Sequence, residues 1–336
     1  MTYFGDPTIW LPLAFAVLMG LSILIYVVLD GFDLGVGVLF PFAEPAQKDR
    51  MVASIGPFWD ANETWLVLAI GILLVAFPTA HGQILTALYL PVAIMLIGLI
   101  LRGVAFEFRA KAPPARKGLW NLSFYAGSMM TALSQGYMLG MYIMGLEQRP
   151  ATWAFAALTA VFLTVGYSFI GAAWLILKTE GALQRKAVGW AKGGIWGLIL
   201  GLGAVSLASP LVSPRIFDKW FTMPEALFLA PLPIISAALV ALLWIALRRL
   251  PTRDDRFAWF PFTVSIAIFA LAFCGMAYSF YPYVVPEKLT IYEAASAPES
   301  LFIVLIGTLF VLPMILGYTV LSYRVFRGKA TALSYE

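Results

Sequence analysis

Charged residues are scarce in this sequence. They make up 12% of its 336 residues, whereas hydrophobic residues make up 61%. Soluble domains carry about 25% charged residues, so this composition excludes a water-soluble protein with a single core. No polar segment is longer than about 25 residues, which argues against a soluble appendage. The sequence therefore predicts one transmembrane domain over residues 1–336.

Cysteine and histidine are almost absent, with one residue of each, Cys274 and His81. A single cysteine excludes an intramolecular disulfide and any site with several cysteine ligands. Haem iron is generally held by His, Cys, Met or Tyr, but the 12 methionines are spread through apolar segments, which is typical of packing. Phosphate-binding loops, dinucleotide fingerprints and nucleophile elbows are also missing. We therefore expect no metal site and no complete catalytic site in this chain alone.

Apolar segments of membrane-spanning length recur along the whole chain. A span needs about 20 mainly apolar residues, and the run from Trp65 to Leu101 is long enough for two spans joined by a tight hairpin at Phe77–Gly82. Tryptophan and tyrosine mark many of the ends, as an aromatic belt would. The sequence predicts an all-α polytopic fold with nine spans: Trp10–Leu29, the two within Trp65–Leu101, Trp120–Met144, Trp153–Leu177, Trp190–Ser209, Ala226–Leu247, Trp259–Tyr281 and Leu301–Tyr323.

Lysine and arginine are sorted by membrane side when nine spans are assumed. One side holds 18 of the 22, and the other holds four, namely Arg149, Arg215, Lys219 and Lys288. The basic side of a membrane protein faces the cytoplasm, so the N-terminus is predicted outside and the C-terminus inside. This sorting accounts for the basic surplus without any nucleic-acid partner.

A faint internal repeat divides the predicted spans. Residues Ser168–Ala172 lead into a basic connection after the fifth span, as Asp30–Phe32 do after the first. Two four-helix bundles, over residues 1–145 and 146–282, would fit this pattern, with a peripheral last helix at 301–323. A chain without a repeat fits the sequence equally well.

Asp30 and Asp33 are the first acidic residues that adjoin an apolar segment of the kind found in membrane spans. Their spacing puts both on one helical face. If the helix continues past them, both lie inside the hydrophobic boundary; if it stops, they are solvated at the interface. Acids at a helix C-terminus oppose the macrodipole, and Gly31, Gly35 and Gly37 permit close helix approach. We therefore favour acids that face protein, and such residues indicate a function by default.

Asp60 and Glu63 form a second acidic pair, flanked by Trp59 and Trp65. Asp-x-x-Glu before an apolar run is typical of a capping box, in which Glu63 would serve the helix start. The same placement faces the cytoplasm, so Asp60 could cap the helix and still exchange protons. Buried acids at the entrance of a span can relay protons. Both readings stay open.

The third predicted span closes on a charged stretch, Arg102–Arg109. Glu107 lies between Arg102 and Arg109 in the sequence and could pair with either. A solvated network at the interface is the simpler interpretation.

Several stretches together resemble a known family, subunit II of cytochrome bd-type quinol oxidases, including the cyanide-insensitive branch. The resemblance runs from the first span to the last. The family usually has Gly where Ala61 stands, a departure that leaves the acidic positions intact. The matching stretches are Asp30–Gly37, Trp59–Trp65, Arg102–Arg109, Lys178–Gly181 and Tyr281–Leu301.

This resemblance implies a haem-free subunit that packs against a haem-bearing subunit I in the bacterial inner membrane. Subunit I of that family carries two b-type haems and a d-type haem, or a third b, and binds quinol. The implied reaction is quinol oxidation coupled to reduction of dioxygen to water. The family's proton-pathway acids fall on Asp33 and Asp60, with Asp30 and Glu63 beside them, and Trp65 matches a tryptophan associated with the oxygen route. Some members also hold a structural quinone or a small single-span third subunit.

A different class, a proton-coupled secondary transporter with Asp30, Asp33 and Asp60 as its coupling site, is the alternative. Transporters place such acids near the midplane on broken helices within paired repeats. Here the acids cluster towards the cytoplasmic edge, and an odd number of spans suits inverted repeats poorly. The sequence favours the oxidase subunit.

Overall fold

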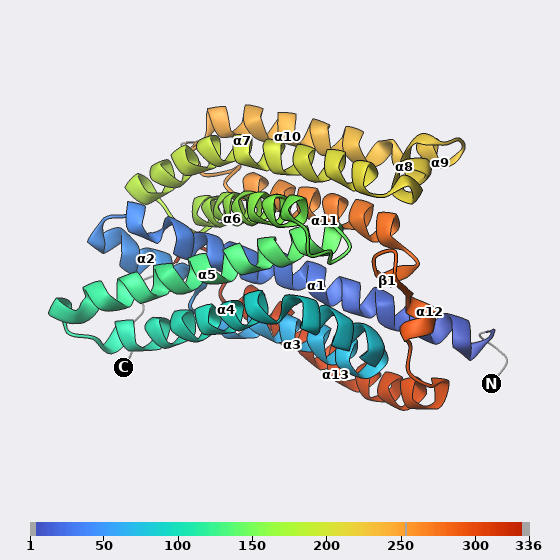
Figure 1. The fold of residues 1–336 in the computed structure, drawn as a ribbon. Coiled ribbons are helices and arrows are strands. Elements are labelled where there is room, and N and C mark those ends of the chain that lie inside the picture. Colours follow the sequence, from blue (N-terminus) through green and yellow to red (C-terminus); the bar gives the residue numbers. More distant parts are fainter. Residues whose placement is uncertain (1–4, 253, 331–336) are drawn as a thin grey trace.

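Long helices lying side by side make up the protein, with one short β-hairpin at one end of the bundle (Figure 1). The computed structural model describes residues 5–252 and 254–330. The elements are α1 Pro7–Leu39, η1 Phe40–Phe42, α2 Pro45–Ile55, α3 Trp59–Ala76, α4 Pro78–Lys111, η2 Pro114–Arg116, α5 Lys117–Ile143, α6 Pro150–Lys178, α7 Gly181–Val212, α8 Pro214–Phe221, α9 Glu225–Leu229, α10 Pro231–Arg249, α11 Phe260–Phe280, β1 Tyr283–Val285, β2 Leu289–Thr290, α12 Ile291–Ala294 and α13 Pro298–Val325.

In the described part of the chain, eight helices are long and apolar enough to cross a membrane. They are α1, α3, α4, α6, α7, α13, α11, and α10 taken together with α9. The multi-pass, all-α class predicted from composition is thereby confirmed. The predicted span at Trp120–Met144 corresponds to α5, which is not among the eight and carries polar residues such as Asn121, Ser128 and Gln135 along its length.

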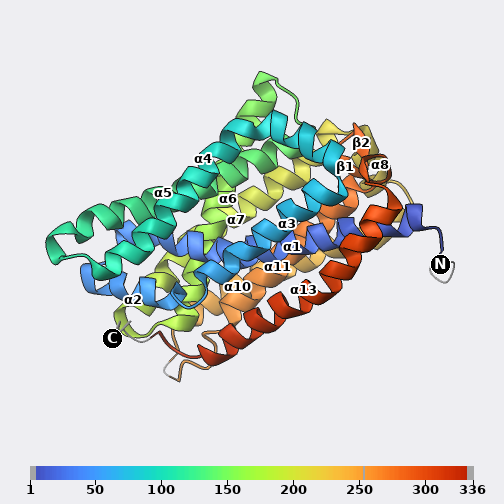
Figure 2. The same ribbon diagram turned by 90° about the horizontal axis from the view of Figure 1, so that it is seen from below.

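Helix α1 lies in the middle of the bundle (Figures 1 and 2) and continues well past the predicted end at Leu29. It ends only at Leu39, so the glycines after Asp30 are helical. Of the two conditions left open by the sequence, the continuing helix is therefore correct. Asp30 and Asp33 are each 0% exposed, so the protein-facing reading is confirmed and interface solvation is wrong.

Glycines set the distance between α1 and α6. A Cβ atom on Gly35 would lie 1.7 Å from the Tyr167 carbonyl oxygen, and one on Gly171 would lie 2.6 Å from Gly35 C. Small residues are favoured at helix contacts in lipid because association there depends on close packing. Glycines also allow the close contact between α4 and α5, where a Cβ on Gly98 would lie 2.8 Å from the Gly127 carbonyl oxygen.

The break between α3 and α4 falls at Phe77, whose φ of −133° and ψ of 59° are not helical. Pro78 follows as the first residue of α4, a position that suits proline because no intrahelical N–H is needed there. The predicted hairpin at Phe77–Gly82 is thus much tighter in the structure. Helix α3 compensates for its limited length by starting at Trp59, six residues before the predicted span.

Helix α13 lies along the outside of the bundle (Figure 2). Only Leu301 and Ser322 of its residues are buried, in contrast to the well-buried α6. Near its C-terminal end, the Tyr323 ring stacks on Phe58, with 4.4 Å between ring centroids. The C-terminal end of the described chain and the amphipathic helix α2, which was not predicted, lie at the same end of the bundle (Figure 1).

Substitution of Gly35 by leucine should prevent α1 from meeting α6. The clash involves the Tyr167 backbone, which cannot move aside like a flexible side chain, so we expect a loss of about 3 kcal/mol of stability. Thermal unfolding of the purified protein measures the loss. Gly71→Ala on α3 is the control, because no atom lies within 4 Å of the added methyl group. Equal melting temperatures for the two variants would contradict the close crossing.

A buried acidic cluster as candidate functional site

One arginine on α4 forms ion pairs with acidic residues from two other helices. Arg102 Nη1 lies 2.6 Å from Asp30 Oδ1 on α1, and Arg102 Nη2 pairs with Glu63 Oε1 on α3. Asp30 is 0% exposed, Arg102 is 2% exposed and Glu63 is 26% exposed. The three side chains therefore run from the core of the bundle to a partly open rim.

Asp33 extends the cluster towards α13. Its Oδ2 accepts a hydrogen bond of 2.8 Å from Asn62 Nδ2, and the same amide nitrogen lies 3.3 Å from the Leu29 carbonyl oxygen. The Tyr323 hydroxyl donates to Asn62 Oδ1 at 3.1 Å. Asn62 thus links α1, α3 and α13. The sequence alone assigned no role to Asn62, which lies within the matching stretch Trp59–Trp65.

The cluster holds more negative than positive groups. Asp30, Asp33 and Glu63 face a single guanidinium, and within the described residues Asp33 Oδ1 has no hydrogen-bond partner. An unpaired charge in a low-dielectric interior is costly, so such oxygens are suited to bind protons or water. The arrangement can therefore take up and pass on protons.

A second group of hydrogen-bonded polar side chains lies next to Asp30, deeper in the bundle. Gln135 on α5 donates from Nε2 to the Tyr26 hydroxyl at 2.6 Å and accepts from the Tyr167 hydroxyl at 2.7 Å. Tyr26 precedes Asp30 by one helical turn and interacts with it electrostatically. These three residues were missed. Each is a polar side chain within a predicted span, and such side chains usually form hydrogen bonds to a neighbouring helix in lipid. That feature of the sequence could have indicated them.

Asp60 does not join the cluster. It is exposed in the first turn of α3, although its charge still acts on Glu63. The predicted capping box is wrong: Phe58 is the N-cap and makes no side-chain cap hydrogen bond. The helix begins two residues earlier than the box requires, which leaves Glu63 too far inside to cap it and lets it reach Arg102 instead.

The two tryptophans beside these acids have different surroundings. Trp59 is partly exposed and packs on Phe106, with 5.2 Å between ring centroids. Trp65 is 1% exposed, and its Nε1 has no hydrogen-bond partner among the described residues. Trp59 therefore fits the predicted interface role, whereas Trp65 lies inside the protein.

Glu107 pairs with neither arginine. It is exposed, whereas Arg109 bonds Asp49 at 2.7 Å and Asn121 at 2.7 Å. Residues 102 and 109 are seven positions apart and share a helical face, while position 107 lies on the opposite face. The possible ion pair is therefore not formed, for a geometric reason, and the exposed Glu107 agrees with the simpler interpretation of a solvated acid. Asp49 lies on α2, which the sequence did not reveal.

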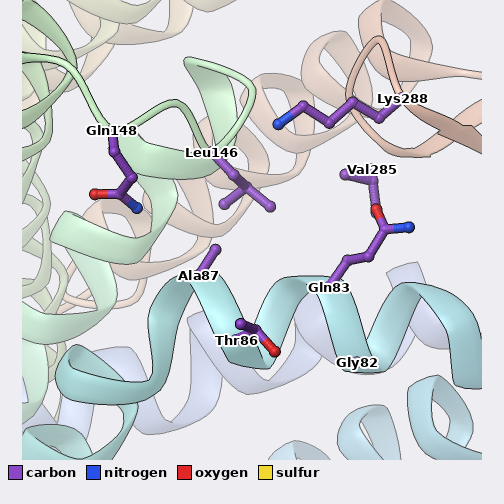
Figure 3. A pocket seen from close by; sticks show the side chains of 8 residues that line it. All are labelled: Gly82, Gln83, Thr86, Ala87, Leu146, Gln148, Val285 and Lys288. Carbon is purple, nitrogen blue, oxygen red and sulfur yellow. The ribbon is translucent and has the colours of Figure 1, made fainter.

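A separate pocket of about 530 Å³ opens at the other end of the bundle (Figure 3). Gln83, Thr86 and Ala87 of α4 line one side, and Leu146 and Gln148 from the α5–α6 connection line another, with Lys288 reaching over from the β-hairpin. This lining holds no acid, histidine or cysteine. The acidic cluster is therefore the stronger candidate site.

A family model described as cytochrome bd terminal oxidase subunit II matches residues 11–326. The chain belongs to this family. It is thus a component of a respiratory quinol oxidase, and the resemblance inferred from the sequence is confirmed.

Individual members of the subunit II family match along nearly their whole length. Cytochrome bd ubiquinol oxidase subunit 2 of Bacillus subtilis is 28% identical over 325 residues, covering 90% of this chain and 92% of that protein. Cytochrome bd-I ubiquinol oxidase subunit 2 of Escherichia coli K12 is 26% identical over 362 residues, with 95% of each chain covered. A chain in the structure of bd oxidase from Geobacillus thermodenitrificans has the same fold, with a TM-score of 0.76 at 18% identity over 95% of this chain and 99% of that chain.

Replacing Arg102 by glutamine should strongly destabilise this family member. It leaves Asp30 and Glu63 without their cation, and breaking a buried pair from one side costs about 3–5 kcal/mol. Addition of Asp30→Asn to Arg102→Gln should restore part of the loss, because it removes one unpaired charge. Melting temperatures of the four members of this double-mutant cycle measure the coupling. Strictly additive effects would show that the two side chains do not interact.

Proposed function

We propose that this chain is the haem-free subunit of a quinol:dioxygen oxidoreductase and that it conducts protons from its basic side towards a haem-bearing subunit I. The observation that carries the proposal is the buried cluster at Arg102, which has an acid surplus and a partly exposed member, Glu63. In this scheme Asp60 gathers protons at the rim, Glu63 takes them inwards, and Asp30 and Asp33 hold them.

Nine spans and a cytoplasmic C-terminus belong to the same proposal. Helix α5 is 27 residues long and packs between α4 and α6, which supports its assignment as the ninth span. Two four-helix groups would then be α1, α3, α4 and α5, followed by α6, α7, α10 and α11. The close contact of Gly35 with Gly171 joins the first helix of each group. Helix α13 would be the peripheral ninth.

We infer that this chain holds no haem of its own, because it has few of the usual haem ligands. Its single histidine, His81, lies in the first turn of α4, far along that helix from Arg102, and its single cysteine, Cys274, is exposed. We therefore assign the two b-type haems and the d-type or third b-type haem to subunit I. The chain's own contribution is the polar route and the packing surface.

The remaining assignments follow the family. We propose location in the bacterial inner membrane, with quinol and dioxygen as substrates of the complex. Trp65 is assigned to oxygen access, in keeping with its burial beside the cluster. A bound structural quinone and a small single-span third subunit are further features that the complex would share with some members. The transporter alternative is disfavoured because the family match covers nearly the whole chain.

Optical spectroscopy tests which of the two subunits binds the haems. We expect reduced-minus-oxidised spectra of this chain purified alone to show no haem bands, and spectra of the chain purified with its partner to show b-type bands and, where haem d is present, d-type bands. Haem bands from the single chain would overturn the haem-free assignment. Absence of haem from both preparations would contradict the oxidase proposal itself.

Asp33→Asn tests the proton route. The amide keeps the shape and an acceptor for Asn62 Nδ2, but it cannot carry a proton, so quinol-driven oxygen consumption should fall about tenfold or more. Glu107→Gln is the matched control, because Glu107 is an exposed acid outside the cluster. Haem content must equal wild type in both variants. Wild-type turnover in Asp33→Asn or in Asp60→Asn would remove that residue from the route.

A further inference from the structure

A pocket of about 290 Å³ lies at the basic end of the bundle, next to the point where α6 and α13 end. Lys178, the last residue of α6, lines it together with Arg327 and Lys329 from the segment after α13. Phe58 and Val325 supply apolar walls. Because both helices are long enough to span the membrane, their ends place the pocket at the level of lipid headgroups.

The positive charge in this pocket is incompletely neutralised. The Lys178 side chain is 6% exposed; its ammonium donates to the Phe326 carbonyl oxygen at 2.7 Å and lies 5.3 Å from the Phe58 ring centroid. No carboxylate in the described residues pairs with Lys178 or Arg327, whereas Lys329 pairs with Asp255. A buried ammonium held only by a carbonyl and aromatic rings is unusual, since buried charges normally have a counter-charge.

The residues around Lys178 are held in place by backbone contacts. Ala330 N donates to the Lys178 carbonyl oxygen at 2.7 Å, and Lys329 Nζ donates to the Thr179 carbonyl oxygen at 3.0 Å. Arg50 of α2 adds a hydrogen bond of 2.8 Å to the Ala330 carbonyl oxygen. The segment after α13 is thus fixed against the end of α6, and the pocket between them is a built feature. Nothing in the proton route uses these residues.

We propose that this pocket binds the phosphate of an anionic phospholipid. The phosphodiester would face Lys178 and Arg327, and the start of the acyl chains would lie against Phe58 and Val325. Basic pockets between spans on the cytoplasmic side favour such headgroups, each nearby cation contributing about a fivefold gain in affinity. This inference does not depend on the proposed oxidase function, because it uses only the pocket, its charges and its depth.

Titration of the purified two-subunit complex with phosphatidylglycerol, followed by native mass spectrometry, tests the site. We expect Arg327→Gln to weaken the binding of one lipid roughly fivefold, and Lys178→Gln with Arg327→Gln to weaken it about 25-fold. Arg324→Gln is the matched control: it removes the same charge from the same end of α13, at an exposed residue that does not line the pocket. Lys178→Arg should retain binding.

The Arg327→Gln variant keeps the test decisive if the complex with Lys178→Gln fails to assemble. Arg327 is exposed and makes none of the contacts that hold the segment after α13 against α6. Equal phosphatidylglycerol binding by wild type and Arg327→Gln would overturn the proposal. So would equal binding of zwitterionic phosphatidylcholine at the same site, because an anion would then not be required. Complete displacement of the lipid by millimolar inorganic phosphate would assign the site to a free anion and refute the lipid.

Discussion

The structure depends on one guanidinium that neutralises acids from two other helices. Arg102 is 2% exposed and binds the buried Asp30 and the partly exposed Glu63, so both pairs can form only if α1, α3 and α4 are all in place. Breaking such a pair is costly, while forming it gains little over an apolar contact. The cluster therefore adds little stability of its own. It makes the arrangement of three helices specific, and it keeps ionisable groups inside a membrane protein, where they are retained for function.

The same eight residues of α1, Asp30–Gly37, fulfil two requirements at once. On a helix, positions 30, 33 and 37 share one face, and positions 31 and 35 share another. The second face carries the glycines that let α6 approach until Gly171 meets Gly35. The first face presents the acids to α3 and α4. The motif therefore combines a face of small residues for helix packing with a face of acids that is covered by α3 and α4.

The class of fold and the buried position of Asp30 and Asp33 could be predicted from the sequence because both rest on local patterns. Apolar run length predicts spans, and acids within such runs stand out. The pairing of Arg102 could not be predicted in this way, since Glu107 is closer in sequence but lies on the wrong helical face. The start of α3 at Trp59 follows Phe58, which is 1% exposed and stacks on Tyr323 of α13, a contact between residues far apart in the sequence. Helix α2 was missed because an amphipathic helix of 11 residues has no span-length signal.

The position of the acids also favours one of the two functional classes considered from the sequence. Transporters place coupling acids on broken helices near the midplane, whereas Asp30 and Asp33 lie within one continuous helix, α1. Here Glu63 is the only partly exposed member of the Arg102 cluster, and it opens towards the end of the bundle where Asp60 is exposed. Inwards, the polar contacts continue through Tyr26 to Gln135 and Tyr167, all held by short hydrogen bonds between packed helices. A surplus of carboxylates reached from one side is suited to proton uptake, because each proton that enters relieves an uncompensated charge.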